Sequence, residues 1–282
     1  MSGELSLVQA LEAEEPLVMV ELRPPAAGLD AAASMDAWID SHHGVGRLRR
    51  SGRFVLLTDN AVGRSEEENL AHLEGNLPGE SDSLGVIPFL TCKHSLEYCL
   101  WYADRAWSSG FRAITVVGGD QGGAPRCLPH AYQLRERIRS RVPDLSLGGW
   151  VNPHRDPVEQ VGFLAGAGDC TDFYLSQMVS EHSAPQVANF LNELEVRAVG
   201  LPGVFGIFYY RSAHPDTLRR LGKFFPVPSR AVAEAFDRGV PPEELCARSL
   251  RALREVGVRH VYLSNLHVRT AASTVEAVLR LV

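Results

Sequence analysis

Residues 85–119 read GVIPFLTCKHSLEYCLWYADRAWSSGFRAITVVGG, and this stretch decides the fold. An apolar run of β-strand character, Gly85–Thr91, precedes a segment from Ser95 to Trp107 whose apolar side chains recur every three or four residues, as on one face of a helix. A second β-rich run, Ala113–Val117, follows. Strand, helix and strand in this order predict two parallel strands joined by a crossover helix.

The same alternation extends along the whole chain of 282 residues. Eight apolar runs have the length and composition of buried strands: Leu17–Leu22, Phe54–Leu57, Gly85–Thr91, Ala113–Val117, Leu145–Trp150, Asp172–Gln177, Gly203–Phe208 and His260–Leu263. Eight strand–helix units predict a single-domain (β/α)₈ barrel over residues 1–282, with 1–15 as an N-terminal extension. The chain length agrees, because such barrels have about 250 residues. An open, doubly wound sheet is the alternative, since hydrophobic period does not reveal closure.

The composition excludes several classes of protein. Hydrophobic residues make up 45% and charged residues 22% of the chain, as in soluble globular proteins. The net charge is −6, and no long basic tract exists that would follow a nucleic-acid backbone. No apolar run reaches the roughly 18 residues of a membrane span, and no signal pattern opens the chain. Five scattered cysteines are typical of reduced thiols. We therefore expect a cytoplasmic protein without nucleic-acid or membrane partners. The sequence does not indicate its oligomeric state.

Glu21 is the first candidate functional residue. In a (β/α)₈ barrel the active site lies at the carboxyl ends of the strands, and Glu21 is near the end of the first apolar run. Because burying an unpaired carboxylate is costly, Glu21 should face the barrel mouth or be paired. Desolvation there would raise its pKa and suit it to general-acid catalysis. The alternative is an ion pair with a nearby arginine.

Polar or aromatic residues also end other strands. Thr58 follows the second run and would either line a site or cap the next helix. Gly119 and Asp120 end the fourth, where glycine permits close approach of a ligand. Trp150 offers an aromatic plane or packs in the core, and the Gln177 amide is suited to a heterocycle edge. The sequence has no histidine pair with metal-ligand spacing, so we expect no metal site.

Several of these segments resemble the methylenetetrahydrofolate reductase family. The resemblance covers about residues 17–266 and rests on four segments. Val20-Glu21-Leu22-Arg23-Pro24-Pro25 is similar to the family's Phe-Glu-Phe-Phe-Pro-Pro, and Phe89-Leu90-Thr91-Cys92 to its His-Leu-Thr-Cys. The strand ending in Gly118-Gly119-Asp120 resembles one ending in Arg-Gly-Asp, and Asp172-Phe173-Tyr174-Leu175-Ser176-Gln177 resembles Asp-Phe-Phe-Ile-Thr-Gln.

This resemblance implies a (β/α)₈-barrel oxidoreductase of one-carbon metabolism and methionine biosynthesis. The implied reaction is reduction of 5,10-methylenetetrahydrofolate to 5-methyltetrahydrofolate with NAD(P)H. Glu21 would be the general acid, and Asp120 would bind the pterin and stabilise the 5-iminium cation electrostatically. Gln177 and Thr58 would bind substrate in the same pocket. His267 stands where the family has an arginine near the folate.

The family passes hydride through FAD, and the resemblance implies a cofactor site made of Thr58, Gly119, Ala131, Trp150, His154 and Gln177. However, Phe89 and Gly118 replace the family's histidine and arginine, and no Lys or Arg lies between Asp156 and Gln177. Because a pyrophosphate needs cationic partners, we expect FAD to bind weakly or not at all and hydride to pass directly from the nicotinamide. The alternative is that Lys93 or Arg126 reaches the phosphates and retains the flavin.

Two other functional classes fit the same residues. One is a folate-dependent methyltransferase or demethylase on the same barrel, and the other is a non-catalytic, reductase-like partner subunit. The presence of Glu21, Asp120 and Gln177 together favours an enzyme, because a binding subunit has no need of an acid beside a pterin.

Overall fold

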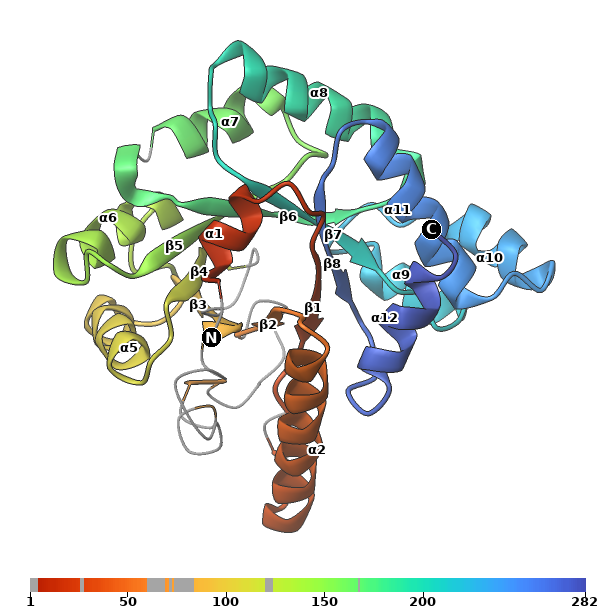
Figure 1. The fold of residues 1–282 in the computed structure, drawn as a ribbon, viewed down its shortest axis with the longest axis horizontal. Helices are drawn as coiled ribbons and strands as arrows, with labels where there is room; N and C mark the ends of the chain where they lie inside the picture. Colours follow the sequence, from red (N-terminus) through yellow and green to blue (C-terminus); the bar gives the residue numbers. More distant parts are fainter. Residues whose placement is uncertain are drawn as a thin grey trace.

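Eight parallel strands form a closed barrel in the computed structural model, which describes residues 5–25, 28–59, 69–70, 73, 84–119, 124–166 and 168–282. Each strand pairs with the next along the chain, and β8 closes the barrel on β1. Helices lie around the outside of the strands (Figure 1). The predicted (β/α)₈ barrel is therefore confirmed, and the eight strands lie within two residues of their predicted bounds.

The strands are β1 (Val18–Leu22), β2 (Val55–Leu57), β3 (Val86–Thr91), β4 (Ala113–Val117), β5 (Ser146–Val151), β6 (Phe173–Val179), β7 (Gly203–Phe208) and β8 (His260–Ser264). The described α-helices are α1 (Leu7–Glu12), α2 (Ala31–Arg50), α5 (Leu96–Ser108), α6 (Ala131–Arg141), α7 (Pro157–Ala165), α8 (Ala184–Val196), α9 (Pro215–Leu221), α10 (Ser229–Asp237), α11 (Pro242–Glu255) and α12 (Ala271–Leu279). Two short 3₁₀ helices, Gly168–Cys170 and Glu181–Ser183, flank β6.

Local chemistry explains where helix α5 begins and ends. The Ser95 hydroxyl accepts a hydrogen bond from the Tyr98 N–H at 3.2 Å and so satisfies one of the free donors of the first turn. Cys99 and Ala103, one helical turn apart, are fully buried in the layer between helices and strands. Gly110, at a φ of 89°, supplies the left-handed backbone that ends the helix.

Side chains alternate between two sides of each strand, and this alternation divides the core in two. Val18 and Val20 of β1 pack outward with the helices, whereas Met19 lies in the cluster that fills the barrel. Glu21 follows Met19 by two residues, so its side chain also points into the barrel. The strand periodicity therefore places this carboxyl at the inner mouth of the barrel.

Helix α1 packs against the cluster inside the barrel. Leu7, Ala10 and Leu11 are buried there together with Met19 and Phe54. The segment expected as an N-terminal extension, 1–15, thus contains a helix that contributes to the core.

Gly206 permits a close packing arrangement inside the barrel. A Cβ atom at this position would lie 2.5 Å from the ring of Tyr262, closer than two carbon atoms can approach. Because Gly206 has no Cβ, the Tyr262 hydroxyl reaches across to the Ser176 carbonyl at 2.6 Å, and the Gly206 N–H donates to Ser176 Oγ at 3.1 Å. These contacts join β6, β7 and β8.

Gly206→Ala should destabilise the barrel, because the added Cβ would force the fully buried Tyr262 ring to shift. We expect the free energy of unfolding in urea to fall by about 1–3 kcal/mol. Gly200→Ala is the matched control, since a Cβ there meets nothing within 4 Å, and its effect should stay within about 0.5 kcal/mol. Equal losses in the two variants would contradict the packing argument.

Candidate functional site

A cavity of about 770 Å³ opens at the carboxyl ends of the strands. Four residues singled out from the sequence line it: Glu21, Thr58, Trp150 and Gln177. They come from β1, the end of β2, β5 and β6, so closure of the sheet brings together side chains that are far apart in the chain. The cavity has the volume of a typical small-molecule site.

Glu21 is nearly enclosed, with 6% of its surface exposed. The Ser264 hydroxyl at the end of β8 donates to Glu21 Oε1 at 2.6 Å. Burial raises the pKa of the Glu21 carboxyl above its ordinary value of 4.5, against the hydrogen bond from Ser264 and the charge of Arg23, which both lower it. A carboxyl with a raised pKa holds its proton to higher pH than an exposed carboxyl does, which suits it to donate that proton to a bound ligand.

Thr58 presents an unsatisfied polar atom. Its side chain is buried and lines the cavity, and its Oγ1 has no hydrogen-bond partner among the residues that the structure describes. A buried hydroxyl without a partner is costly unless a ligand or water supplies one. Thr58 therefore forms part of the cavity wall, with its hydroxyl oxygen enclosed by the protein.

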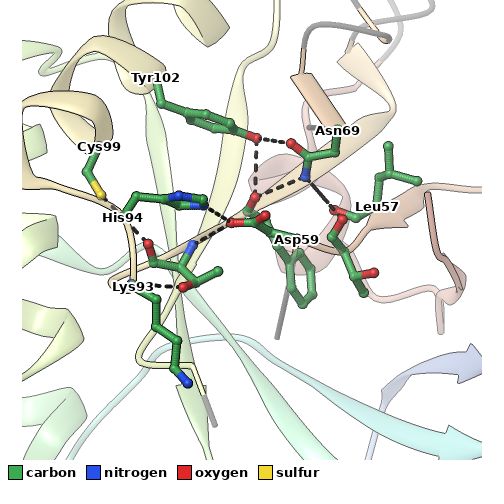
Figure 2. A network of polar contacts seen from close by, with 10 residues as sticks. Leu57, Asp59, Asn69, Lys93, His94, Cys99 and Tyr102 are labelled. Atoms are coloured by element: carbon green, nitrogen blue, oxygen red, sulfur yellow. Dashed lines mark hydrogen bonds and ion pairs between the residues drawn. The ribbon is translucent and has the colours of Figure 1, made fainter. Parts of the chain in front are cut away.

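Asp59 forms the centre of a network that joins the ends of β2 and β3 (Figure 2). Its Oδ2 accepts the Thr91 N–H at 3.1 Å and lies 2.8 Å from His94 Nε2. The Asn69 amide donates to the backbone carbonyls of Leu57 and Thr58 and, at 3.0 Å, to that of Phe89. Asp59 also lines the cavity, so the network holds a second carboxylate in a defined orientation there. The sequence carried one signal of this role, because Asp59 belongs to the run of polar residues that follows the second strand.

An aromatic wall on the β7 side was not anticipated from the sequence. The Phe208 ring lies 5.0 Å from Tyr210 and 5.4 Å from Phe225, between ring centroids, and all three line the cavity. Gln177 Nε2 donates to the Phe224 carbonyl at 3.3 Å, which joins β6 to the segment after α9. The sequence did contain one indication of this wall, because aromatic residues are adjacent to one another in these segments.

Other predicted residues are not brought to this cavity. Gly119 and Ala131 do not line it, and His154 Nε2 lies 2.8 Å from the Met178 carbonyl. His267 is exposed after β8, where its Nδ1 accepts the backbone N–H of Arg269 at 3.3 Å. Asp120 lies outside the described residues.

The residues at the family's flavin positions do not fit a flavin held in the family's way. Phe89 is buried, with its ring edge-on to Trp150 at 6.2 Å, and offers no hydrogen bond. The Arg126 guanidinium lies beside Gly118, but Arg126 donates to the Gly119 carbonyl at 3.1 Å. Neither Arg126 nor Lys93, which lies beside Gly119, is among the described residues that line the cavity.

The described part of the chain contains no group of three or more His, Cys, Asp or Glu side chains that could hold a metal ion. None of its helices has both the length and the apolar character needed to cross a membrane.

The barrel is similar to solved structures with different functions. No protein-family model matches the sequence, and the curated proteins include no match either. An uncharacterized protein from Clostridium thermocellum that binds two copies of 5-methyl-5,6,7,8-tetrahydrofolic acid superposes with a TM-score of 0.64 at 15% identity, covering 95% of this chain and 94% of that one. 2,3-Dimethylmalate lyase, of the PEP mutase/isocitrate lyase superfamily, gives a TM-score of 0.51 at 13% identity, covering 99% and 86%. At these identities the likeness establishes the fold alone.

The raised pKa of Glu21 should make stability depend on pH. Between the unfolded and folded pKa values, the folded chain retains a proton that the unfolded chain has lost. The stability gained from this proton is complete below the unfolded pKa, about 4.3, and is lost as pH rises through the folded pKa. Glu21→Gln removes this titration. The difference in unfolding free energy, variant minus wild type, should therefore increase as pH rises.

Urea unfolding at a series of pH values measures this difference. Ser264→Ala is the companion variant. Losing the hydroxyl that favours the carboxylate should raise the pKa of Glu21 further, so that the loss of stability continues to a higher pH than in the wild type. Parallel pH profiles for the wild type and Glu21→Gln would show that Glu21 has no raised pKa.

Proposed function

We propose that this protein reduces 5,10-methylenetetrahydrofolate to 5-methyltetrahydrofolate, with NAD(P)H as the source of hydride. The observation that carries the proposal is the buried Glu21 carboxyl in a cavity of about 770 Å³ that it shares with Thr58, Trp150 and Gln177. The resemblance at the strand ends supports it, as does the structural likeness to a protein that binds 5-methyltetrahydrofolate.

The cavity offers the groups that a reduced pterin needs. The pyrimidine ring of a reduced pterin is planar and carries both donors and acceptors along its edge. Trp150 provides a flat apolar surface. The Gln177 amide bonds the Phe224 carbonyl and the Met178 N–H, and it keeps one further N–H and one further lone pair for a ligand. We infer that the pterin occupies the inner part of the cavity, close to Glu21.

Glu21 would act by proton transfer. Its proton passes to N10 of the substrate, the N10–methylene bond breaks, and the electron pair of that bond remains on N10. The one-carbon unit is then a 5-iminium cation. Hydride from the nicotinamide adds to its carbon, which completes 5-methyltetrahydrofolate and leaves the oxidised nicotinamide. One proton and one hydride are consumed, so the reaction balances.

A negative charge near the iminium would lower the barrier to its formation. Asp120 is the residue that the family resemblance implies for this task. We propose that Asp59 contributes as well, because its carboxylate lines the cavity and is oriented by the Thr91 N–H and by His94. Glu21 and Asp59 would then divide the work between an acid and an electrostatic stabiliser, as pairs of carboxyls in different environments do.

Glu21→Gln should reduce turnover by about 10²–10⁴-fold, because glutamine keeps the shape of the side chain but cannot donate a carboxylic proton. The assay is oxidation of NAD(P)H with methylenetetrahydrofolate, and quenching of tryptophan fluorescence checks that the variant still binds 5-methyltetrahydrofolate. Glu276→Gln is the control, since this glutamate lies on the surface in an ion pair with Arg53.

Unchanged turnover in Glu21→Gln would remove Glu21 from the mechanism. Methyl transfer by the wild type without NAD(P)H oxidation would favour a methyltransferase or demethylase instead. Folate binding with neither activity would favour a non-catalytic subunit.

We propose that no flavin takes part, because Phe89 and Gly118 cannot replace the family's histidine and arginine toward FAD. Helix α7 adds no cation, and its first turn begins with Asp156 and contains Glu159. The purified protein, incubated with FAD and then dialysed, should retain far less than one flavin per chain after denaturing release. Added FAD should leave the reaction rate unchanged. One flavin per chain together with a rate that requires it would contradict this part of the proposal.

A further inference from the structure

Three of the five cysteines, which are scattered along the sequence, come together beside the end of β3. Cys92 directly follows β3, Cys99 belongs to α5, and Cys127 lies between β4 and α6. The thiol of Cys127 lies close to those of Cys92 and Cys99 and interacts with both. We call these three residues the thiol cluster. None of them is among the described residues that line the cavity, and the proposed reduction uses none of them.

The backbones of Cys92 and Cys127 lie side by side. The Cys127 N–H donates to the Cys92 carbonyl at 2.7 Å, and the side chains of the same two residues meet. Hydrogen-bonded neighbours in a sheet have Cα atoms about 5.5 Å apart, and a disulfide spans about 4.4–6.8 Å between Cα atoms. A bond between these two sulfur atoms therefore requires little movement of the backbone.

The members of the thiol cluster differ in their access to solvent. Cys127 is half-buried, whereas Cys92 and Cys99 are fully buried. Burial raises the pKa of the Cys92 thiol to about 12, although the charges of Arg126 and Arg135 oppose this rise. Burial raises the pKa of the Cys99 thiol as well. Because the thiolate is the reactive form, a reagent in solution should react first with Cys127.

Cys99 is a less suitable partner for Cys127 than Cys92 is. The Cys99 Sγ donates to the Thr91 carbonyl at 3.7 Å (Figure 2), and a bond to Cys127 would remove this buried contact. Cys92, by contrast, is next to Cys127 through both its backbone and its side chain. The geometry therefore favours a bond between Cys92 and Cys127.

We propose that Cys127 and Cys92 form a reversible thiol–disulfide site, in which a hydroperoxide oxidises Cys127 and Cys92 then closes the disulfide. In the first step the Cys127 thiolate attacks one peroxide oxygen and the O–O bond breaks. Cys127 becomes a sulfenic acid, and the second oxygen leaves and takes up the thiol proton. In the second step the Cys92 sulfur attacks the Cys127 sulfur, the S–OH bond breaks, and the hydroxide leaves as water with the Cys92 proton. Two thiols and one hydrogen peroxide give one disulfide and two waters.

Contact between the two residues compensates for the high pKa of Cys92 in the second step. Groups held together in one structure react as if each were present at a very high concentration, so a small fraction of thiolate is sufficient. The charges of Arg126 and Arg135 favour the thiolate that develops on Cys92. The same burial that protects Cys92 from reagents in solution leaves it accessible to Cys127.

The test treats the reduced full-length protein with a small excess of hydrogen peroxide. The remaining thiols are alkylated in denaturant with N-ethylmaleimide, and peptides are mapped by mass spectrometry without reduction. The wild type should lose two of its five thiols. The peptides that contain Cys92 and Cys127 should be joined, with the loss of two hydrogen atoms. Dithiothreitol should restore all five thiols.

Three variants separate the roles of the cysteines. Cys127→Ser should form no disulfide, because the buried thiols do not meet the peroxide. Cys92→Ala should stop at the sulfenic acid of Cys127, which dimedone traps. Cys170→Ser is the matched control, since Cys170 is also half-buried but lies outside the thiol cluster, and it should form the disulfide as the wild type does.

Several results would overturn the proposal without bearing on the folate function. Five thiols remaining in the wild type after treatment would reject the site. A bond between Cys127 and Cys99 would contradict the pairing, and sulfinic acid at Cys127 without a disulfide would show that Cys92 does not reach it. A disulfide between two chains, seen as a dimer on a non-reducing gel, would reduce Cys127 to an ordinary surface thiol.

Discussion

Closure of the sheet between β1 and β8 is the constraint on which the site depends. Val18, Met19 and Val20 pair with Val261, Tyr262 and Leu263, and this register places Ser264 beside Glu21. The two residues are 243 positions apart in the sequence, yet the hydroxyl lies 2.6 Å from the carboxyl oxygen. A carboxyl at the inner mouth of an apolar barrel is costly to ionise, and one hydrogen bond satisfies it only in part. Closure thus creates the cavity and encloses a carboxyl with a raised pKa within it.

The cavity combines different electrostatic environments. Glu21 lies in an apolar setting that favours its protonated form, while Asp59 is bound by a backbone N–H and by His94. The β7 and β1 side adds cations that the described residues leave unneutralised. This arrangement is compatible with the proposed folate substrate, which has a neutral ring and an anionic tail. Charges at an exposed rim act mainly on encounter and selectivity, whereas buried groups determine the chemistry.

The fold by itself does not assign this chemistry. One similar structure binds 5-methyltetrahydrofolate and another is a dimethylmalate lyase, and both share the barrel at 13–15% identity. Barrels of this kind support many reactions through the residues at their strand ends. The proposed function therefore depends on particular side chains, above all on Glu21.

By itself, the sequence determined the eight strand–helix units and part of the barrel mouth, whereas closure of the sheet came from the tertiary structure. Hydrophobic period and strand–helix alternation are local properties, so residues 85–119 already predict one complete unit, and the alternation within β1 turns Glu21 inward. Thr58 and Gln177 were found because the carboxyl ends of barrel strands converge. Only the tertiary structure decided that Ser264 contacts Glu21 and that Arg23 and Arg220 border one cavity. Those contacts join segments far apart in the chain, and their geometry depends on strand register and loop packing, which no local pattern encodes.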